Sequence, residues 1–204
     1  IGTDYEGISH MLSKETGVPT LSFDTNGINS YEKGAESAYL AIAKKFLKPL
    51  SRKSTSGVNI LGASPLDFGN GLQIESMINL LNDHCYEVNS IWGMRSNLGE
   101  IAESLNSELN IVVSTAGLAA ARYLKEEYDM PFTVGFPAGM KHREIFLERL
   151  NGKDITLGRG NSDSELTTLI LGEQTFSNSL REALLFETDL VDIRVASFFE
   201  MDEA

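Results

Sequence analysis

The sequence contains one cysteine, Cys85, and three histidines, His10, His84 and His142. A single thiol excludes a disulfide framework within the chain and any metal site built from cysteines alone. The histidines have none of the spacings that are typical of metal-ligand pairs. We therefore expect no metal ligands and no bound cofactor in the chain itself.

Basic residues are also scarce, with 17 Lys and Arg against 29 Asp and Glu, and the net charge is −12. Nucleic acids and anionic membranes bind basic surfaces, so the charge balance argues against both as partners. No apolar run approaches the roughly 20 residues of a membrane span, and no signal peptide is recognisable. With the lone cysteine, these features predict a cytoplasmic setting.

The sequence does contain a regular alternation of apolar strands and amphipathic helices. Strands that are continuous apolar runs, separated by helices, predict a parallel sheet covered on both faces. The predicted fold class is therefore α/β, a doubly wound Rossmann-like sheet with flanking partial α/β segments. Its four central strands, expected side by side, are 58–61, 88–92, 110–114 and 132–136; further strands are expected at 18–24, 168–171 and 191–196.

Two polar stretches, 51–57 and 151–165, divide this pattern. They predict a central four-strand domain over 51–150. Residues 1–50 are then the tail of a preceding α/β domain, and residues 151–204 are a linker and the start of a following one. We accordingly expect the chain to be a piece of a longer protein.

The stretch 109–139 is the most informative part of the sequence, because it forms one complete βαβ unit. Ser114, Thr115, Ala116 and Gly117 follow its first strand, and such small residues let a backbone or a bulky ligand approach closely. In open parallel sheets, ligands bind outside the carboxyl ends of the strands. The sequence therefore predicts a binding site at this loop.

Three other strand-end loops are expected to converge with it on one open edge of the central domain: 62–64, 93–95 and 137–139. The candidate cofactor-binding residues are Gly62, Ser64, Arg95, Ser114, Thr115 and Gly139. Arg95 carries a charge that suits a carboxylate or an anionic cluster. The sequence identifies no catalytic residue and no metal ligand.

Several residues have a plain structural interpretation. The glycine-rich loop 62–71 has neither GxGxxG nor Walker A spacing, and we interpret it as a turn in which Asp67 and Asn70 cap the next helix. Cys85 is expected to be a core or surface thiol, and His142 a solvated residue at a helix start. Trp92 lines a pocket or anchors the core, and the sequence leaves both open.

Three segments of the sequence carry a joint resemblance: IGTDYEGISHMLSKETGVPTLSFDTNG (1–27), GVNILGASPLDFGNGLQIESMINLL (57–81) with EVNSIWG (87–93), and the 109–139 unit. Together they resemble the nitrogenase component 1 type oxidoreductases. This family includes nitrogenase molybdenum–iron protein subunits, cofactor-assembly scaffold homologues and light-independent protochlorophyllide reductase subunits. The resemblance implies that the chain covers the family's middle domain and parts of its neighbours.

The resemblance also implies an activity for the parent protein. Such a parent receives low-potential electrons from an ATP-dependent iron–sulfur reductase and works with a paired homologous subunit in an oligomer. Its iron–sulfur cluster passes the electrons to a substrate or a metallocofactor. Ser114 falls about where the catalytic subunit of molybdenum nitrogenase has a cofactor-ligating cysteine, and serine is a poor ligand for such a cluster. The chain alone is expected to lack catalysis.

A second hypothesis belongs to another class of protein. A doubly wound domain without metal can simply bind a sugar or another small metabolite. Cysteines upstream of Ile1 would favour the oxidoreductase, and their absence would favour the binding module.

Overall fold

The computed structural model describes residues 4–23, 27–48, 56–153, 155 and 168–197. Its centre is a four-stranded sheet in the order β2-β1-β3-β4, in which every pair of neighbours is parallel. The strands are β1 (Gly57–Leu61), β2 (Glu87–Ile91), β3 (Leu109–Val112) and β4 (Phe132–Val134). The predicted doubly wound α/β fold, with these four strands side by side, is confirmed.

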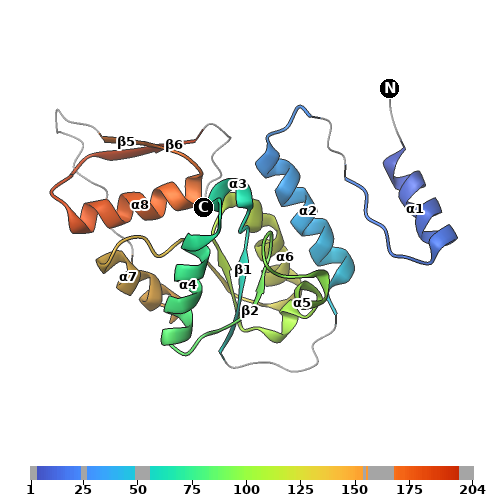
Figure 1. Cartoon of the computed structure of the whole chain (residues 1–204), viewed down its shortest axis with the longest axis horizontal. Helices are drawn as coiled ribbons and strands as arrows, with labels where there is room; N and C mark the ends of the chain where they lie inside the picture. The colour runs from blue at the N-terminus through green and yellow to red at the C-terminus, as the bar shows by residue number, and fades with distance from the viewer. Residues whose placement is uncertain (1–3, 24–26, 49–55, 154, 156–167, 198–204) are drawn as a thin grey trace.

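Helices cover both faces of this sheet (Figure 1). One face packs on α4 (Leu72–Asp83) and α7 (Lys141–Leu150), which contribute Ile74, Met77 and Phe146 to its core. The other packs on α5 (Leu98–Ala102) and α6 (Leu118–Tyr128), whose apolar residues surround Trp92. Strands covered on both faces are apolar on both sides over most of their length, which explains the largely apolar runs of the sequence.

The strand order reverses between β1 and β3, because the chain runs from β1 outward to β2 and later from β3 outward to β4. Parallel strands end at the same edge of a sheet, so the loops after all four strands lie along one edge. In such folds the binding crevice forms where the order reverses. The loops after β1 and β3 therefore mark the expected position of a site.

The flanking segments dock on this central sheet. Helix α2 (Tyr31–Phe46) joins the face of α6 and inserts Ala43 into that core. Helix α8 (Gln174–Glu187) lies beside a second, two-stranded parallel sheet of β5 (Thr168–Leu171) and β6 (Ile193–Ala196) (Figure 1).

An aromatic contact fixes the start of α8 against the central sheet. The ring of Phe176 lies 5.4 Å from that of Phe136 and 6.3 Å from that of Phe68. The chain after residue 167 is therefore packed on the sheet rather than separate from it. The domain boundaries at 50 and 150 stay a prediction.

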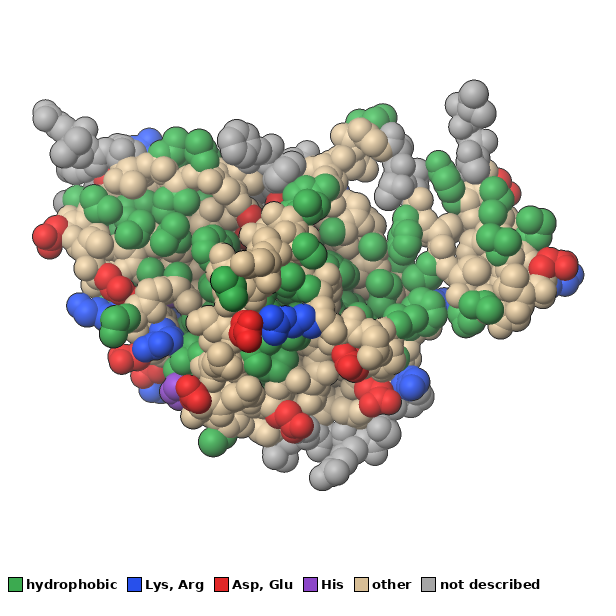
Figure 2. Space-filling model, in the orientation of Figure 1, with side chains coloured by type: hydrophobic (Ala, Val, Ile, Leu, Met, Phe, Trp, Pro, Cys, Tyr) green, Lys and Arg blue, Asp and Glu red, His purple; other side chains and the backbone are tan. Residues whose placement is uncertain are grey.

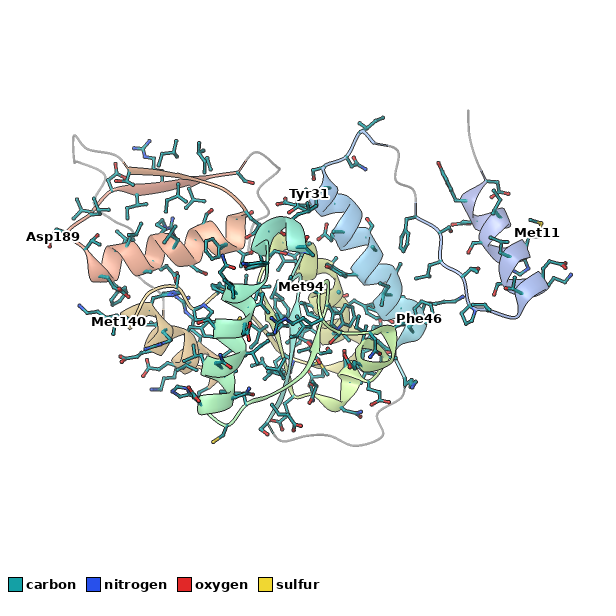
Figure 3. All side chains as sticks on the ribbon, in the orientation of Figure 1. Met11, Tyr31, Phe46, Met94, Met140 and Asp189 are labelled. Atoms are coloured by element: carbon teal, nitrogen blue, oxygen red, sulfur yellow. The ribbon has the colours of Figure 1, made fainter. Side chains whose placement is uncertain are left out.

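The N-terminal helix α1 (Tyr5–Thr16) is capped by Asp4, which accepts a hydrogen bond from the Gly7 amide at 2.8 Å. Its apolar residues, Met11 among them, remain exposed, and Figure 2 shows hydrophobic side chains gathered on the surface of this helix. Figures 1 and 3 show the helix standing apart from the sheet.

The predicted strand at 18–24 is wrong over its described residues, 18–23. That segment runs without a partner strand among the described parts of the chain. An apolar sequence alone does not supply such a partner.

Other boundaries differ in smaller ways. Asn97 and Glu100 form a capping box at the start of α5. Helix α5 ends at Ala102, and Leu105 lies in the short 3-10 helix η1 (Ser104–Asn106). Most of the two predicted linkers lies outside the described residues, and Gly57 already belongs to β1. Among the helices that the structure describes, none is both long and apolar enough to span a bilayer.

Candidate functional site

The base of the crevice between β1 and β3 is closed by direct contact. The Ser114 hydroxyl donates a hydrogen bond of 2.7 Å to the carbonyl oxygen of Gly62. Gly62 has a φ of +88°, and a Cβ there would lie 2.5 Å from Ser114 Oγ. A Cβ on Gly117, at the turn into α6, would meet the Leu61 backbone at 2.8 Å. Small residues are therefore required here for strand-to-helix packing.

The edge above Ser114 is covered, so the expectation of an open edge is wrong at this loop. Ser114 is 1% exposed and Thr115 5% exposed. The Thr115 amide donates a hydrogen bond of 2.8 Å to Glu173 Oε1. Glu173 also caps α8, because its Oε2 accepts from the Phe176 amide at 2.7 Å. Residues beyond 151 thus wall the site that they were expected to leave open.

Three acidic side chains meet at this position, and we call Glu32, Asp67 and Glu173 the carboxylate cluster. They come from the first turn of α2, from the short helix α3 (Pro65–Phe68) after β1, and from the start of α8. Tyr31, labelled in Figure 3, donates its hydroxyl to Asp67 Oδ1. Glu32 Oε1 and Asp67 Oδ2 are buried and have no hydrogen-bond partner among the described residues. Buried acidic oxygens without donors favour the protonated carboxyl group.

The electrostatics follow from this arrangement. Burial, with the nearby charges of Glu173 and Asp67, raises the pKa of Glu32 to about 7. The Thr115 hydroxyl opposes that rise in pKa only weakly, since it makes no hydrogen bond of normal geometry with the described residues. Burial likewise raises the pKa of Asp67 and of Glu173. Glu32 is therefore the member of the cluster whose pKa is raised into the neutral range, a property that no local pattern in the sequence reveals.

Four of the six predicted site residues belong to this part of the edge: Gly62, Ser64, Ser114 and Thr115. Ser64 begins α3, and its hydroxyl accepts a hydrogen bond of 3.1 Å from the Leu66 amide. Its role in the structure is thus to cap the helix that carries Asp67.

The other two predicted residues lie elsewhere along the edge. Arg95 turns to the neighbouring helix α4, where it forms an exposed ion pair of 3.2 Å with Glu75. Gly139 lies against Glu187 at the far end of α8, roughly 20 Å along the helix axis from its start at 1.5 Å per residue. In the structure Arg95 thus pairs with α4, and Gly139 packs against the end of α8.

His142 is not the solvated residue that we expected, because it is 1% exposed. Its Nδ1 accepts a hydrogen bond of 3.4 Å from the Ala138 amide, and its Nε2 lies 2.8 Å from Glu182 Oε2. Since Nδ1 is the acceptor, Nε2 holds the proton and donates to Glu182. The partner is on α8, which the local sequence around His142 does not reveal.

The remaining structural interpretations have mixed outcomes. Asn70 accepts a hydrogen bond from the Leu72 amide at 3.2 Å and so supports the start of α4. Asp67 does not cap that helix, because it faces Tyr31. Trp92 is a core residue, fully buried, and its indole donates to the hydroxyls of Ser90 and Ser104. Cys85 is exposed.

An iron–sulfur cluster does not fit the residues that this structure describes. No group of three or more His, Cys, Asp and Glu among them is arranged to hold a metal ion. Glu32, Asp67 and Glu173 have raised pKa values. Their side chains are not arranged as metal ligands. Ser114 directs its hydroxyl to the Gly62 carbonyl. The described residues therefore offer no complete ligand set for such a cluster.

These features define the class of protein: a doubly wound α/β protein with a buried group of carboxylates at the edge where the order of its parallel strands reverses. The family model for nitrogenase component 1 type oxidoreductases matches residues 1–152. The chain belongs to this family, and the predicted resemblance is confirmed.

Curated relatives and solved structures agree with this assignment. The chain is 25% identical over 158 residues to a light-independent protochlorophyllide reductase subunit of Chlorobium chlorochromatii (strain CaD3), covering 73% of this chain and 29% of the relative. It is 33% identical over 98 residues to the corresponding subunit of Chlorella vulgaris, covering 48% of this chain and 19% of the relative. A solved structure of nitrogenase Cp1 at pH 6.5 superposes with a TM-score of 0.56 and 20% identity, over 66% of this chain and 27% of that one. The last similarity supports the fold, and the chain spans less than a third of each protein.

Proposed function

We propose that this chain is part of an oxidoreductase subunit whose whole protein receives low-potential electrons and uses an iron–sulfur cluster to reduce a substrate or a metallocofactor. One observation carries the proposal: the family match over residues 1–152 includes the whole four-stranded sheet and the loops at its carboxyl edge. The relatives named above are subunits of a reductase. A paired homologous subunit and an ATP-dependent iron–sulfur reductase are the partners that the proposal implies.

The chain itself supplies position and protons rather than cluster ligands. Electrons that reduce a substrate are accompanied by protons, so a group that titrates near neutral pH is useful beside the reacting centre. Glu32, with its pKa raised to about 7, is such a group at the carboxyl edge of the sheet. The hydrogen bond from Thr115 to Glu173 keeps α8 on that edge.

Iron analysis tests whether the ligands of the iron–sulfur cluster lie in segments of the whole protein other than residues 1–204. After anaerobic reconstitution with iron and sulfide, residues 1–204 alone are expected to bind no stoichiometric iron, because they include a single cysteine. The whole protein, purified anaerobically with its partner subunit, is expected to contain stoichiometric iron and acid-labile sulfide. A full iron–sulfur cluster in residues 1–204 would contradict the assignment of ligands to other segments.

A second candidate function is metal-free binding of a small metabolite. It is favoured by a cavity of about 220 Å³ between the carboxyl edge of the sheet and α8. The two candidates differ in a simple observation: a whole protein free of iron, with no cysteines upstream of Ile1, would support the binding module.

A further inference from the structure

The cavity beside α8 has a charge that no described side chain neutralises. It lies between the ends of β3 and β4, represented by Thr115 and Gly135, and the helix face that carries Asn178 and Arg181. Arg149 of α7 closes another side. The cavity is therefore formed only when α8 docks on the central sheet.

Two of the three charged residues in this lining neutralise each other. Arg149 donates to Glu182 through Nη1 at 2.8 Å and Nη2 at 3.2 Å, a two-point pair. Burial alone would raise the pKa of Glu182, but the hydrogen bonds from His142 and Arg149 outweigh it and hold the pKa at about 2. Glu182 thus stays ionised and fully engaged with partners other than Arg181.

Arg181 is the remaining charge. Its guanidinium makes no hydrogen bond or ion pair with the residues that the structure describes, and its Nε is buried without a partner. Asn178 lies three residues earlier, hence on the same helix face, and its amide is also without a hydrogen bond among the described residues. A buried donor without an acceptor, such as Arg181 Nε, costs free energy. An acceptor that enters the cavity would remove this cost.

The chemistry of the donors defines the ligand. A guanidinium matches the paired oxygens of a carboxylate or a phosphate, and an amide N–H donates to the same acceptors. At about 30 Å³ for each water in the liquid, the volume holds roughly seven waters, so a small anion fits with part of its hydration. Glu173, an acidic residue, lies at the start of α8, roughly 12 Å along the helix axis from Arg181. The anion is therefore held at the Arg181 end of the cavity.

We propose that this cavity is a binding site for a small oxyanion, held by the guanidinium of Arg181 and the side-chain amide of Asn178. The anion is a free carboxylate or phosphate, or the same group on a larger metabolite. The site needs neither a cluster nor a reductase. Its failure would therefore leave the proposed redox function intact, and the reverse also holds.

Calorimetric titration and thermal unfolding of the whole protein test this site, with inorganic phosphate and succinate as separate probes. At least one anion is expected to bind and to raise the Tm. Arg181→Gln is expected to weaken its affinity at least about tenfold, since charge-assisted hydrogen bonds are lost. Arg181→Lys keeps the positive charge but lacks the planar guanidinium. Its affinity for the anion should lie between those of the natural protein and Arg181→Gln. The better-bound probe identifies the head group as phosphate or carboxylate.

Arg143→Gln is the matched control, because Arg143 is an exposed arginine on the neighbouring helix α7. It should leave the affinity unchanged. Without anion, Arg181→Gln should unfold at no lower temperature than the natural protein, since its guanidinium has no described partner to lose. Should that variant fail to fold, Asn178→Ala decides instead, with an expected loss of about threefold to tenfold. Absence of binding by both anions, or equal affinity in the natural protein and the deciding variant, would overturn the proposal.

Discussion

Gly62→Ala is expected to lower the free energy of unfolding by about 3 kcal/mol, through left-handed backbone strain and overpacking together. The added Cβ would lie 2.5 Å from Ser114 Oγ and 3.0 Å from the Gly117 amide nitrogen. The hydroxyl can rotate away only by giving up its hydrogen bond to the Gly62 carbonyl, and the Gly117 backbone cannot yield without moving α6. Urea unfolding of the two proteins measures the effect.

Gly152→Ala separates the two causes. Gly152 has a comparable φ of +79°, but a Cβ there meets no described atom within 4 Å. It should therefore show the backbone strain alone, about 1 kcal/mol. Equal losses in the two variants would mean that the contact between the β1 and β3 loops does not constrain the crevice as described.

Glu32→Gln is expected to raise the free energy of unfolding at high pH and to have a much smaller effect on it at low pH. The pKa of Glu32 is raised from 4.5 to about 7, so the folded state holds this proton more tightly than the unfolded state. Stability from this group is greatest below the unfolded pKa and falls as pH rises to the folded pKa. Because of this group, the free energy of unfolding of the natural protein should fall by about 2 kcal/mol between pH 5 and pH 8. The Glu32→Gln variant should not show this fall.

The measurement is the difference in free energy of unfolding between variant and natural protein across that range. Glu126→Gln is the matched control, because it replaces a glutamate that is exposed on α6, and the Glu32→Gln difference should vary with pH more strongly than the control difference. If the Glu32→Gln difference varies with pH no more than the control difference, the pKa of Glu32 is not raised into the neutral range.

The sequence predicted the parts of the fold that depend on local patterns. Apolar runs located the four strands of the main sheet. The failed strand at 18–23 shows the limit of that reasoning. A strand needs a neighbour for its hydrogen bonds, and nothing in the residues themselves shows whether one is available.

The site was harder to predict, because it depends on contacts between distant segments. Glu32 and Glu173 come together only when α2 and α8 pack on the same edge of the sheet, and each alone resembles an ordinary helix-start carboxylate. Arg95 was expected at the site for its charge, but its partner Glu75 lies on the adjacent helix.

A buried polar network was missed for a similar reason. Asn59 is fully buried inside an apolar strand. Its side-chain amide donates to the Ser104 carbonyl at 3.0 Å and to Asn110 Oδ1 at 2.9 Å, and its oxygen accepts from Ser90 at 2.8 Å. Buried polar groups are satisfied by partners of this kind, but the pairing across strands is visible only in three dimensions.

The central claim, that the whole protein is an electron-accepting oxidoreductase, is tested most directly by electron paramagnetic resonance. The whole protein and its partner subunit are mixed anaerobically with the ATP-dependent iron–sulfur reductase, and spectra are compared with MgATP and with MgADP. The account predicts a change in the signal of an iron–sulfur cluster in the complex that requires MgATP and leads to substrate or cofactor reduction. A complex without cluster signals, or one whose cluster never changes its redox state with MgATP, would contradict it.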